Sequence, residues 1–376
     1  MANLAGADEF AGAGDRIVAR NPVRFVDKQY TADGGARCGA RCCAHPPDRT
    51  RQLVREAQNR IERMRIGIIG AGAIGASLGA LLVRGGHEVG FAARGEHLAA
   101  IREHRAAIDG QRLLIVQNGL DGIVVGTEEA PECEIVGGLA VYAASYLNAG
   151  HIAVTTGGTL YVGGTGGAGG TDGAGSTGGT GGAVDAVRAD IAVAAEVPAR
   201  ELAALFGAVL PTVYSSNFVG AQWTKLMLNQ INALPAITGL SVQETVANDR
   251  LRLILTASMR EAVGVAAARG IRFATLQGLS DTLLRVFASM PLWIGQAMPR
   301  LMSARIGSVP NPGSTLQSIR RGRLTEIDYL NGALVRAAEA IGVAAPVNAA
   351  LVTLVHEVER TTVFLSAGEV AERITV

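Results

Sequence analysis

A glycine-rich turn between an apolar segment and a periodic segment constrains this chain more than any other feature. The turn reads Gly70-Ala71-Gly72-Ala73-Ile74-Gly75, with the mostly apolar residues 65–69 before it and residues 76–84 after it. The first glycine permits a tight turn, the second lets a pyrophosphate approach the backbone, and the third lets helix and strand pack closely. The helix N-terminus then faces the phosphates. This spacing predicts a dinucleotide site, and close packing without a ligand is the alternative explanation of the glycines.

The composition of the chain excludes several classes of partner. The net charge is +1 and aromatic residues make up 4% of the 376 residues, so a nucleic acid and an anionic membrane surface are both disfavoured. Residues 66–83 carry no charge and reach the length of a membrane span. Glycines interrupt them, however, and glycine is a poor helix former. A strand, a turn and a helix explain this segment better, so we expect no membrane segment.

The order of the segments predicts two folded domains. Strands and helices alternate over residues 64–210, which is typical of the α/β class with a parallel sheet. We therefore expect a Rossmann-type N-terminal domain there, followed by an all-helical C-terminal domain over residues 211–376. Within the first domain, residues 157–182 are mostly glycine, threonine and alanine. Such a segment buries too little apolar surface to order itself, so we expect a flexible insert between two strands.

The individual elements follow from the apolar periods. Strands are expected at residues 65–69, 88–93, 113–117, 134–142, 151–155 and 160–162. Helices are expected at residues 76–84, 96–104, 199–209, 220–237, 241–269, 276–290, 325–341 and 345–359.

Residues 1–63 differ from the rest because they show no sustained apolar period, apart from a short polar helix at 52–63. We expect a disordered extension. It contains Cys38, Cys42, Cys43 and His45, which are zinc-type ligands. Zinc sites usually combine two spaced pairs in a folded knuckle, so we interpret these residues as incidental and expect no metal. Four cysteines in the whole chain do not make a disulfide framework, which favours a cytoplasmic location.

The identity of the dinucleotide depends on the residue that comes after the second strand. An NAD site usually carries Asp or Glu there, about 20 residues after the glycines, to bind the ribose hydroxyls. Here residues 88–93 are followed by Arg94. An arginine pairs with a 2′-phosphate but offers a ribose hydroxyl no acceptor. We therefore expect NADP(H) as the cofactor, with chance placement of one of many arginines as the alternative.

Lys225 is one of only two lysines in a chain with 32 arginines. It lies in an apolar segment expected to be helical, and Asn229 and Asn232 stand at i+4 and i+7 on the same face. A lysine among apolar residues can act as a tuned acid, whereas an arginine does not readily release a proton. The pattern predicts a proton donor beside two amides. A lysine that extends to solvent beside two structural amides is the alternative.

Two further polar residues are candidates for the same site. Glu326 lies in the expected first turn of a helix, where capping and compensation of the helix dipole are the alternative roles. Asn118 comes after an apolar strand at its carboxyl end, where open α/β sheets bind ligands. A simple Asn-Gly turn with Gly119 is the competing explanation.

In this order, the motifs resemble the ketopantoate reductase (2-dehydropantoate 2-reductase) family. The resemblance covers residues 64 to about 359, apart from the glycine-rich insert. The lysine and glutamate motifs are specific to that family, whereas the glycine fingerprint alone is not. The matching stretches beyond the fingerprint are Gly-His-Glu-Val at 86–89, Ala-Arg-Gly at 93–95, Gln-Asn-Gly-Leu at 117–120, Trp-Thr-Lys-Leu at 223–226 and Thr-Glu-Ile-Asp-Tyr-Leu-Asn-Gly at 325–332.

The resemblance implies an enzyme that uses NADPH to reduce ketopantoate to (R)-pantoate, on the route to pantothenate and coenzyme A. It places Lys225 at the catalytic lysine and Glu326 at the substrate-site glutamate of the family. It places Asn118 near the lysine and the nicotinamide, and Asn229 at a substrate contact. Asn311 and Ser314 match polar residues around the substrate carboxylate.

The chain also departs from the family pattern at two places. A second family asparagine is expected two turns after the lysine, but Ala233 stands there and Asn232 comes one residue earlier. This makes the exact substrate an open question. Only residues 105–112 connect the helix ending at His104 to the strand from Leu113. A strand–helix–strand unit needs about 30 residues, so the N-terminal domain is expected to be truncated, with a gap in its sheet.

These departures leave two alternatives beside a ketopantoate reductase. One is an inactive or unstable truncated relative that at most binds nucleotide, and the other is a reductase of a different 2-oxo acid. The expected partner is a small-molecule 2-oxo acid. A homodimer is compatible with the sequence, which does not define the oligomeric state.

Overall fold

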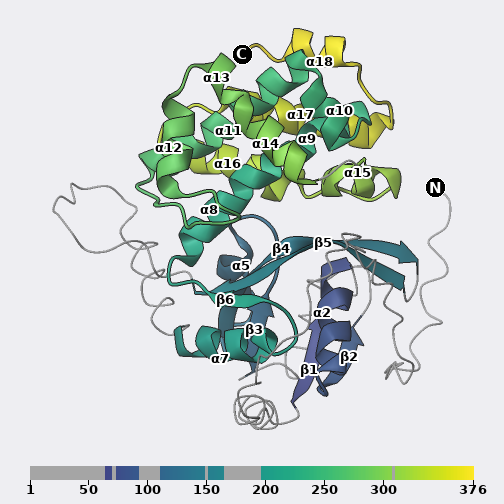
Figure 1. The fold of residues 1–376 in the computed structure, drawn as a ribbon, viewed down its shortest axis with the longest axis vertical. Coiled ribbons are helices and arrows are strands. Elements are labelled where there is room, and N and C mark those ends of the chain that lie inside the picture. Colours follow the sequence, from purple (N-terminus) through teal and green to yellow (C-terminus); the bar gives the residue numbers. More distant parts are fainter. Residues whose placement is uncertain (1–63, 70–72, 93–110, 149–150, 165–195, 307–309) are drawn as a thin grey trace, which may run out of the picture. The chain divides into compact units, whose positions relative to one another are not determined.

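The computed structural model describes residues 64–69, 73–92, 111–148, 151–164, 196–306 and 310–376 (Figure 1). Several sequence expectations lie outside these residues: the extension 1–63 with its cysteines, Gly70 and Gly72, Arg94, the helix at 96–104, and most of the glycine-rich insert. The chain divides into two compact units. One is built around the first two strands, and the other contains the helical region together with most of a second sheet.

In its described residues, the first unit contains a strand, a helix and a strand. β1 (Arg65–Ile69) pairs in parallel with β2 (Glu88–Ala92), and α2 (Ala73–Arg84) connects them. Leu78 and Leu82 of α2 are buried, as the apolar period of the helix requires. A parallel pair linked through a helix confirms the expected α/β start of the chain.

The second sheet has the strand order β3-β4-β5-β6. Its strands are β3 (Arg112–Ile115), β4 (Glu134–Asn148), β5 (His151–Gly163) and β6 (Thr212–Tyr214). β3 pairs in parallel with β4, and β5 pairs in parallel with β6. α5 (Gly122–Glu129) lies between β3 and β4 in the chain, and α7 (Glu196–Gly207) precedes β6. The described strands thus form two sheets, β1–β2 and β3–β6.

β5 corrects two sequence expectations. The strands expected at 151–155 and 160–162 are one continuous strand, and it includes Gly157–Gly163, the first part of the expected insert. The reason is the alternation of Leu160, Tyr161 and Val162. Leu160 and Val162 are fully buried, and the three residues pair with β6. Tertiary pairing therefore overrides the low β-propensity of the glycines.

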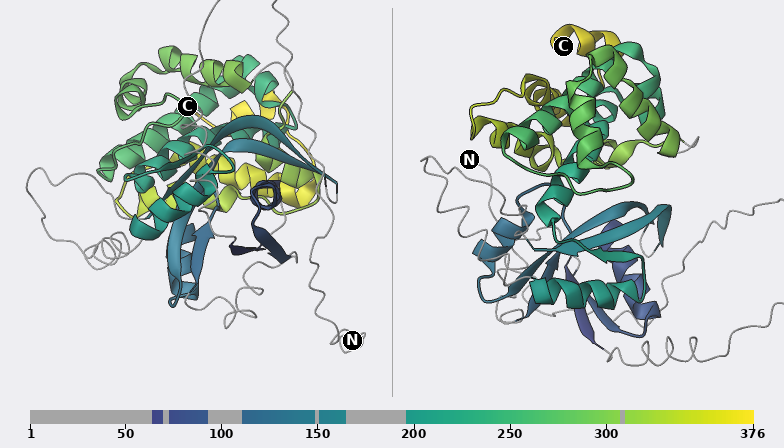
Figure 2. Two further views of the ribbon diagram at one scale, coloured as in Figure 1. Left: turned by 60° about the horizontal axis from the view of Figure 1, so that its bottom comes forward. Right: turned by 60° about the vertical axis from the view of Figure 1, so that its left-hand side comes forward.

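The helical region of the second unit runs from Phe218 to Arg373 (Figure 2). Its elements are α8 (Phe218–Asn229), η1 (Gln230–Asn232), α9 (Ala233–Thr238), α10 (Val242–Ala247), α11 (Asp249–Ala268), α12 (Asp281–Ser289), α13 (Leu292–Gly295), α14 (Ala297–Ile306), α15 (Gly313–Arg320), η2 (Ile327–Tyr329), α16 (Asn331–Glu339), α17 (Pro346–Thr361) and α18 (Ala367–Arg373). α11 packs against α8, α10, α12, α14, α16, α17 and α18. Its side chains Leu251, Leu255 and Met259 are fully buried, so this helix forms the centre of the core.

Three expected long helices are interrupted. The helix expected at 220–237 passes through the 3-10 turn η1, because Pro235 has no N–H to donate to the preceding turn. The helix expected at 241–269 breaks at Asn248, whose side chain accepts hydrogen bonds from the first N–H groups of α11. The helix expected at 325–341 is the short η2 followed by α16. The helix expected at 345–359 is confirmed as α17, with Pro346 in its first turn.

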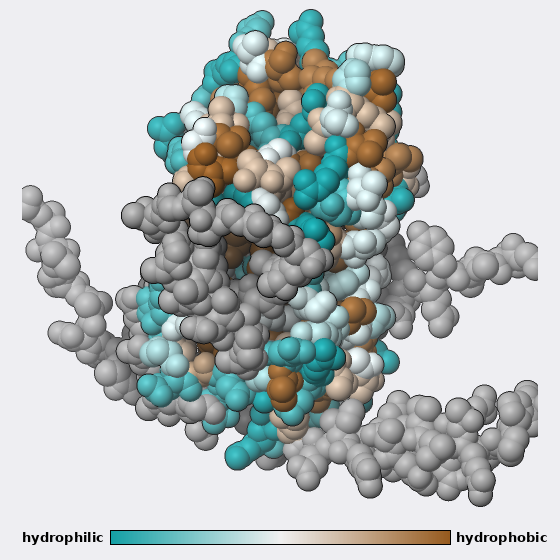
Figure 3. Space-filling view, turned by 90° about the vertical axis from the view of Figure 1, so that its left-hand side faces the viewer, coloured by the Kyte–Doolittle hydropathy of each residue, from teal (hydrophilic) through white to brown (hydrophobic). Residues whose placement is uncertain are grey.

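In the described part of the chain, no helix has the length and apolar character needed to cross a membrane. Over the helical region, hydrophilic and hydrophobic side chains are interspersed on the face drawn in Figure 3.

Candidate active site

Lys225 projects from α8 toward the second sheet. Its Nζ donates a 2.8 Å hydrogen bond to the carbonyl oxygen of Ala140, in β4. α8 is fixed at its start by Asn217, whose side-chain oxygen accepts from the N–H of Gly220 at 3.0 Å. Thr224, fully buried, donates from Oγ1 to the carbonyl oxygen of Ala274. These hydrogen bonds hold α8 in place at its first turn and at Thr224, the residue before Lys225.

The surroundings of Lys225 change its acidity. Burial lowers the pKa of its ammonium group to about 8, while the negative charge of Glu326 acts in the opposite direction. Desolvation has the larger effect: the ammonium group loses more free energy of hydration on burial than it gains by attraction to the Glu326 carboxylate. At neutral pH the lysine is still protonated, but it releases its proton more readily than a lysine in water. A group with these properties can act as a general acid.

Asn118 and Glu326 are joined directly. Asn118 Nδ2 donates a 2.8 Å hydrogen bond to Glu326 Oε2. Gly119 has a φ of +93° and packs against the carbonyl oxygen of Tyr329, where a Cβ atom would collide. Arg336 Nη2 lies 3.0 Å from Asp121 Oδ2. The turn after β3 therefore contacts Glu326, Tyr329 and Arg336. The sequence offered an Asn-Gly turn and a functional Asn118 as alternatives, but the turn forms and the Asn118 side chain also makes a hydrogen bond.

Glu326 is not in the first turn of a helix, which corrects the sequence expectation. It precedes η2, and α16 begins only at Asn331. The chain cannot continue as one helix because Leu330, at the junction, has φ −105° and ψ −94°. Glu326 is the N-cap residue of η2 but makes no side-chain capping hydrogen bond there, so capping does not explain its carboxylate. Its side chain is exposed and its described hydrogen-bond partner is Asn118.

Asn229 shares α8 with Lys225, as the sequence predicts, whereas Asn232 lies beyond that helix. Asn229 is the last residue of α8, and Asn232 ends η1. Both are partly buried, and among the described residues neither side chain makes a hydrogen bond. A Cβ built on Gly313 would lie 2.7 Å from Asn232 Oδ1, which places Asn232 against the start of α15. Within the described part of the chain, two amides without hydrogen-bond partners are therefore available close to the helix that carries the lysine.

Asn311 and Ser314 have different surroundings. Asn311 Oδ1 accepts a 2.9 Å hydrogen bond from the N–H of Gly313, and its own N–H donates to Gln243 Oε1 at 3.0 Å. Its side-chain oxygen thus shapes the turn into α15. Ser314 is exposed in the first turn of α15. No contact between described residues joins either of them to Lys225, Asn118 or Glu326.

Two models of one protein family match the chain. "Ketopantoate reductase PanE/ApbA" matches residues 66–112 and "Ketopantoate reductase PanE/ApbA C terminal" matches residues 217–359. The chain belongs to the ketopantoate reductase family. The second match contains Lys225, Glu326 and both amides that come after the lysine, and the family is one of oxidoreductases that act on CH–OH groups.

Curated relatives agree with this family along most of the chain. The 2-dehydropantoate 2-reductase of Archaeoglobus fulgidus is 26% identical over 339 residues, covering 78% of this chain and 98% of the relative. The enzyme of the same name from Pyrococcus horikoshii is 27% identical over 316 residues, covering 79% and 98%.

Solved structures share the fold. A ketopantoate reductase from Ralstonia eutropha JMP134 superposes with a TM-score of 0.56 at 24% identity, covering 79% of this chain and 99% of that one. A D-mandelate dehydrogenase in complex with NADH gives a TM-score of 0.61 at 19% identity, with the same coverage. These likenesses confirm the Rossmann-like parallel-sheet region followed by a helical region.

In this ketopantoate reductase family member, the residues expected to bind the cofactor are described only in part. Ala73, Ile74 and Gly75 form the first turn of α2, directly after the glycine turn. That first turn contains no acidic residue, so nothing within it opposes a phosphate at the helix N-terminus. β2 ends at Ala92, two residues before Arg94. The described residues fit a dinucleotide whose phosphates lie at α2.

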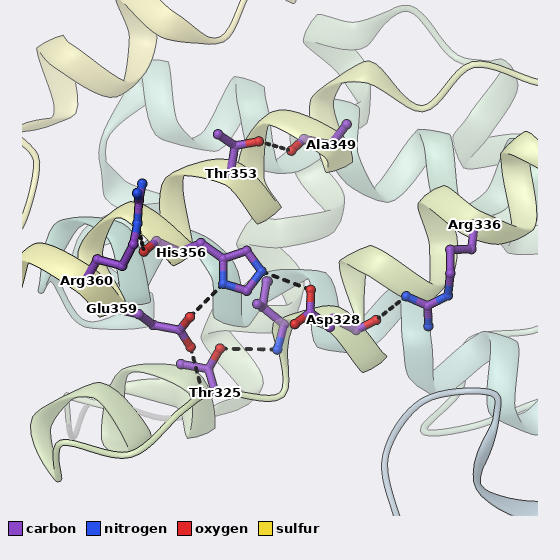
Figure 4. Close-up of polar contacts among 9 residues, drawn as sticks. Thr325, Asp328, Arg336, Ala349, Thr353, His356, Glu359 and Arg360 are labelled. Carbon is purple, nitrogen blue, oxygen red and sulfur yellow. Dashed lines mark hydrogen bonds and ion pairs between the residues drawn. The ribbon is translucent and has the colours of Figure 1, made fainter. Parts of the chain in front are cut away.

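Several residues that organise the site carried no signal in the sequence. Ala140 contributes only a carbonyl oxygen, which any residue in that strand would offer. His356 and Glu359 of α17 contact the segment around Glu326 from about 30 positions away (Figure 4). Thr224 and Asp328 lay inside the recognised motifs, beside the lysine and the glutamate. For Thr224 and Asp328, membership of those motifs was the sequence signal that could have identified them as site residues.

Proposed function

We propose that this chain is an NADPH-dependent reductase that converts ketopantoate to (R)-pantoate. The observation that carries the proposal is Lys225, a lysine with a pKa of about 8 that senses the charge of Glu326. Glu326 in turn is bound to Asn118. Two amides that have no hydrogen-bond partner among the described residues come after the lysine in the chain. These groups can donate a proton and bind the polar ends of a 2-oxo acid.

The chemistry needs one hydride and one proton. NADPH, when bound, would supply the hydride to the keto carbon. The carbonyl π electrons move to oxygen, and Lys225 gives its Nζ proton to that oxygen, so that C=O becomes CH–OH and the lysine becomes neutral. A single positioned acid contributes about 10²–10⁴-fold to such a step. Lys225 then recovers a proton from solvent, which its pKa of about 8 allows at neutral pH.

Glu326 is proposed to select the substrate. An ionised carboxylate only accepts hydrogen bonds, so the substrate group that meets it must be a donor. Ketopantoate has a hydroxyl group, whereas its deoxy analogue trimethylpyruvate has none. Asn118 holds one carboxylate oxygen at 2.8 Å, which leaves the other for the substrate hydroxyl. Asn229 and Asn232 are proposed to bind the substrate from the lysine side, with Ser314 and Asn311 nearer its carboxylate.

The residue two positions after β2 favours NADP(H) over NAD(H). Arg94 stands where an acidic residue would bind the ribose of NAD. An arginine at this point would pair with the 2′-phosphate of NADP. The N-terminus of α2 and the glycine turn would hold the pyrophosphate.

Reduction of a different 2-oxo acid is the second candidate. Ala233 in place of the expected asparagine favours it, and so does the fold shared with a D-mandelate dehydrogenase. The separation of the described strands into two sheets favours instead the third candidate, a truncated relative without activity.

The full-length chain and steady-state oxidation of NADPH distinguish these candidates. We expect turnover with ketopantoate, and a kcat/KM for trimethylpyruvate lower by at least about tenfold, because a carboxylate without its donor is costly. The Glu326→Gln variant should lose most of that preference, whereas Glu128→Gln, on α5, should keep it. Equal kcat/KM for both substrates supports another 2-oxo acid. No turnover, together with a melting temperature that NADPH does not raise, supports the inactive relative.

A further inference from the structure

His356 lies between two carboxylates at the edge of the candidate site. Its Nδ1 is 2.7 Å from Glu359 Oε2, and its Nε2 is 2.9 Å from Asp328 Oδ1 (Figure 4). Glu359 is one turn further along α17, whereas Asp328 belongs to η2. The imidazole ring therefore bridges α17 to the segment that contains Glu326.

The two neighbouring carboxylates favour a protonated ring. An ionised carboxylate only accepts hydrogen bonds, and a neutral imidazole has one N–H donor and one acceptor nitrogen. A neutral His356 would turn an unprotonated nitrogen toward one of the two carboxylates. The imidazolium ion, with two N–H donors, satisfies both. Burial lowers the pKa of His356, but the hydrogen bonds and charges of Glu359 and Asp328 outweigh it, so the pKa is raised above its usual value of 6.5.

His356 and Glu359 bind the chain just before and just after Glu326. Glu359 uses its other oxygen, Oε1, to accept a 2.7 Å hydrogen bond from the N–H of Thr325. His356 binds Asp328, two residues after Glu326. Residues 325–328 are thus bound to α17 at Thr325, immediately before Glu326, and at Asp328, two residues after it. Both attachments depend on the His356–Glu359 pair.

Other charges near this contact come from neighbouring elements. Arg336 of α16 donates to the backbone carbonyl of Asp328 at 3.1 Å, and Arg360 of α17 donates to the backbone carbonyl of His356 at 3.3 Å. α11 contributes Glu261, which is bound to Asn348 at the opposite end of α17. α9, which also packs on α17, contains no ionisable residue. Among the described residues, Asp328 and Glu359 are therefore the ionisable side chains in contact with the ring.

We propose that His356 is a positioning residue: in its protonated form it binds Asp328 and Glu359 and thereby fixes Glu326 for the substrate. The consequence for the reaction rests on the proposed function of Glu326. Because the folded-state pKa is raised, the contact is fully present below the ordinary pKa of 6.5 and is lost as the pH rises through the raised value. Loss of the contact frees the segment and weakens substrate binding. Proton transfer by Lys225 is a separate step, so the effect of His356 falls on KM rather than on kcat.

Kinetics as a function of pH test the consequence. In the wild-type chain, KM for ketopantoate should rise as His356 loses its proton. In His356→Gln, which cannot carry a charge, KM should be raised at low pH by at least about fivefold and should not change further with pH. The matched control is Glu357→Gln, next to His356 on α17, which removes the 2.8 Å ion pair of Glu357 with Arg373 of α18. It should keep the wild-type pH profile. A wild-type profile in His356→Gln would overturn the proposal.

Amide hydrogen exchange tests the contact without any turnover. Peptides that span residues 325–330 should exchange faster by about tenfold in His356→Gln than in wild type at the same low pH, whereas Glu357→Gln should match wild type. If no 2-oxo acid is reduced but this difference is found, the proposed function is wrong and the positioning contact is correct. Unchanged exchange in His356→Gln would overturn the contact itself.

Discussion

Asn118 and Glu326 share a 2.8 Å hydrogen bond although 208 positions separate them in the sequence. The bond joins the turn after β3 to the segment before α16. It leaves one oxygen of Glu326 for a ligand and gives that carboxylate a fixed orientation. Substrate recognition in this chain should therefore depend on Asn118 as well as on Glu326.

Replacing Asn118 tests this dependence. Asn118→Ala removes one charge-assisted hydrogen bond, and we expect KM for ketopantoate to rise about tenfold with a smaller change in kcat. Asn118→Asp places a second negative charge against Glu326 and should raise KM further. Steady-state kinetics at saturating NADPH measure both. A KM near the wild-type value in Asn118→Asp would show that the bond has no role in substrate binding.

Lys225 should be irreplaceable by arginine. Lys225→Ala should lower kcat by at least about 10², and Lys225→Arg should be nearly as damaging, because a guanidinium keeps its proton and has a different reach. A structural lysine predicts the opposite order, with arginine mild and alanine harmful through stability. The comparison requires kcat and the melting temperature of both variants. An active and stable Lys225→Arg enzyme would remove Lys225 from the mechanism.

The pH dependence of kcat/KM should follow the ionisation of Lys225. Only protonated Lys225 can donate, so the rate should fall as the pH rises through about 8. In His356→Gln this limb should remain, because burial, the main cause of the lowered pKa of Lys225, is unchanged. A rate that stays constant well above the pKa of Lys225 would contradict a lysine acid with this pKa.

Gly119 should tolerate no side chain. It has a φ of +93°, and an added Cβ would collide with the carbonyl oxygen of Tyr329. Gly278 has a φ of +80° with no atom within 4 Å of an added Cβ, so it is the matched control. Gly278→Ala should cost about 1–2 kcal/mol from backbone strain alone. Gly119→Ala should lower the free energy of unfolding by more, and chemical denaturation measures both.

Asn348 holds a buried polar network in the helical region. It is fully buried, donates to Glu261 Oε2 at 2.6 Å and accepts from Asn331 Nδ2 at 2.9 Å. Asn348→Ala deprives these partners of their hydrogen bonds to Asn348 and should cost about 2–4 kcal/mol of unfolding free energy. Thr353→Ala, on an exposed face of the same helix, should change it by at most about 0.5 kcal/mol. Similar losses in both variants would show that the network is not specifically stabilising.

Arg94 should decide between the two cofactors. Arg94→Ala removes a charge-assisted contact worth about 1.5–3 kcal/mol, and we expect it to weaken the binding of NADPH much more than that of NADH. Titration of both dinucleotides by fluorescence or calorimetry measures the two dissociation constants. Equal losses for NADPH and NADH would refute the assignment of Arg94 to the 2′-phosphate.

Local patterns were sufficient for much of the fold. The apolar strand at 65–69, the helix after the glycine turn and the helix that begins at Pro346 all appear in the structure, because their periods and end residues act over a few positions. The motifs around Lys225 and Glu326 were likewise sufficient to identify the family. Local patterns did not reveal the breaks at η1 and before α16, or the continuation of β5 into the glycine-rich segment.

The sequence by itself therefore determined the class of fold, the family and the residues proposed to carry its chemistry. Only the tertiary structure decided that Asn118 binds Glu326 and that burial lowers the pKa of Lys225. It also decided that His356 and Glu359 bind residues on either side of Glu326. The physical reason is distance along the chain. Helix periods and caps are local, whereas desolvation and the contacts of a carboxylate depend on residues that only folding brings within a few ångströms.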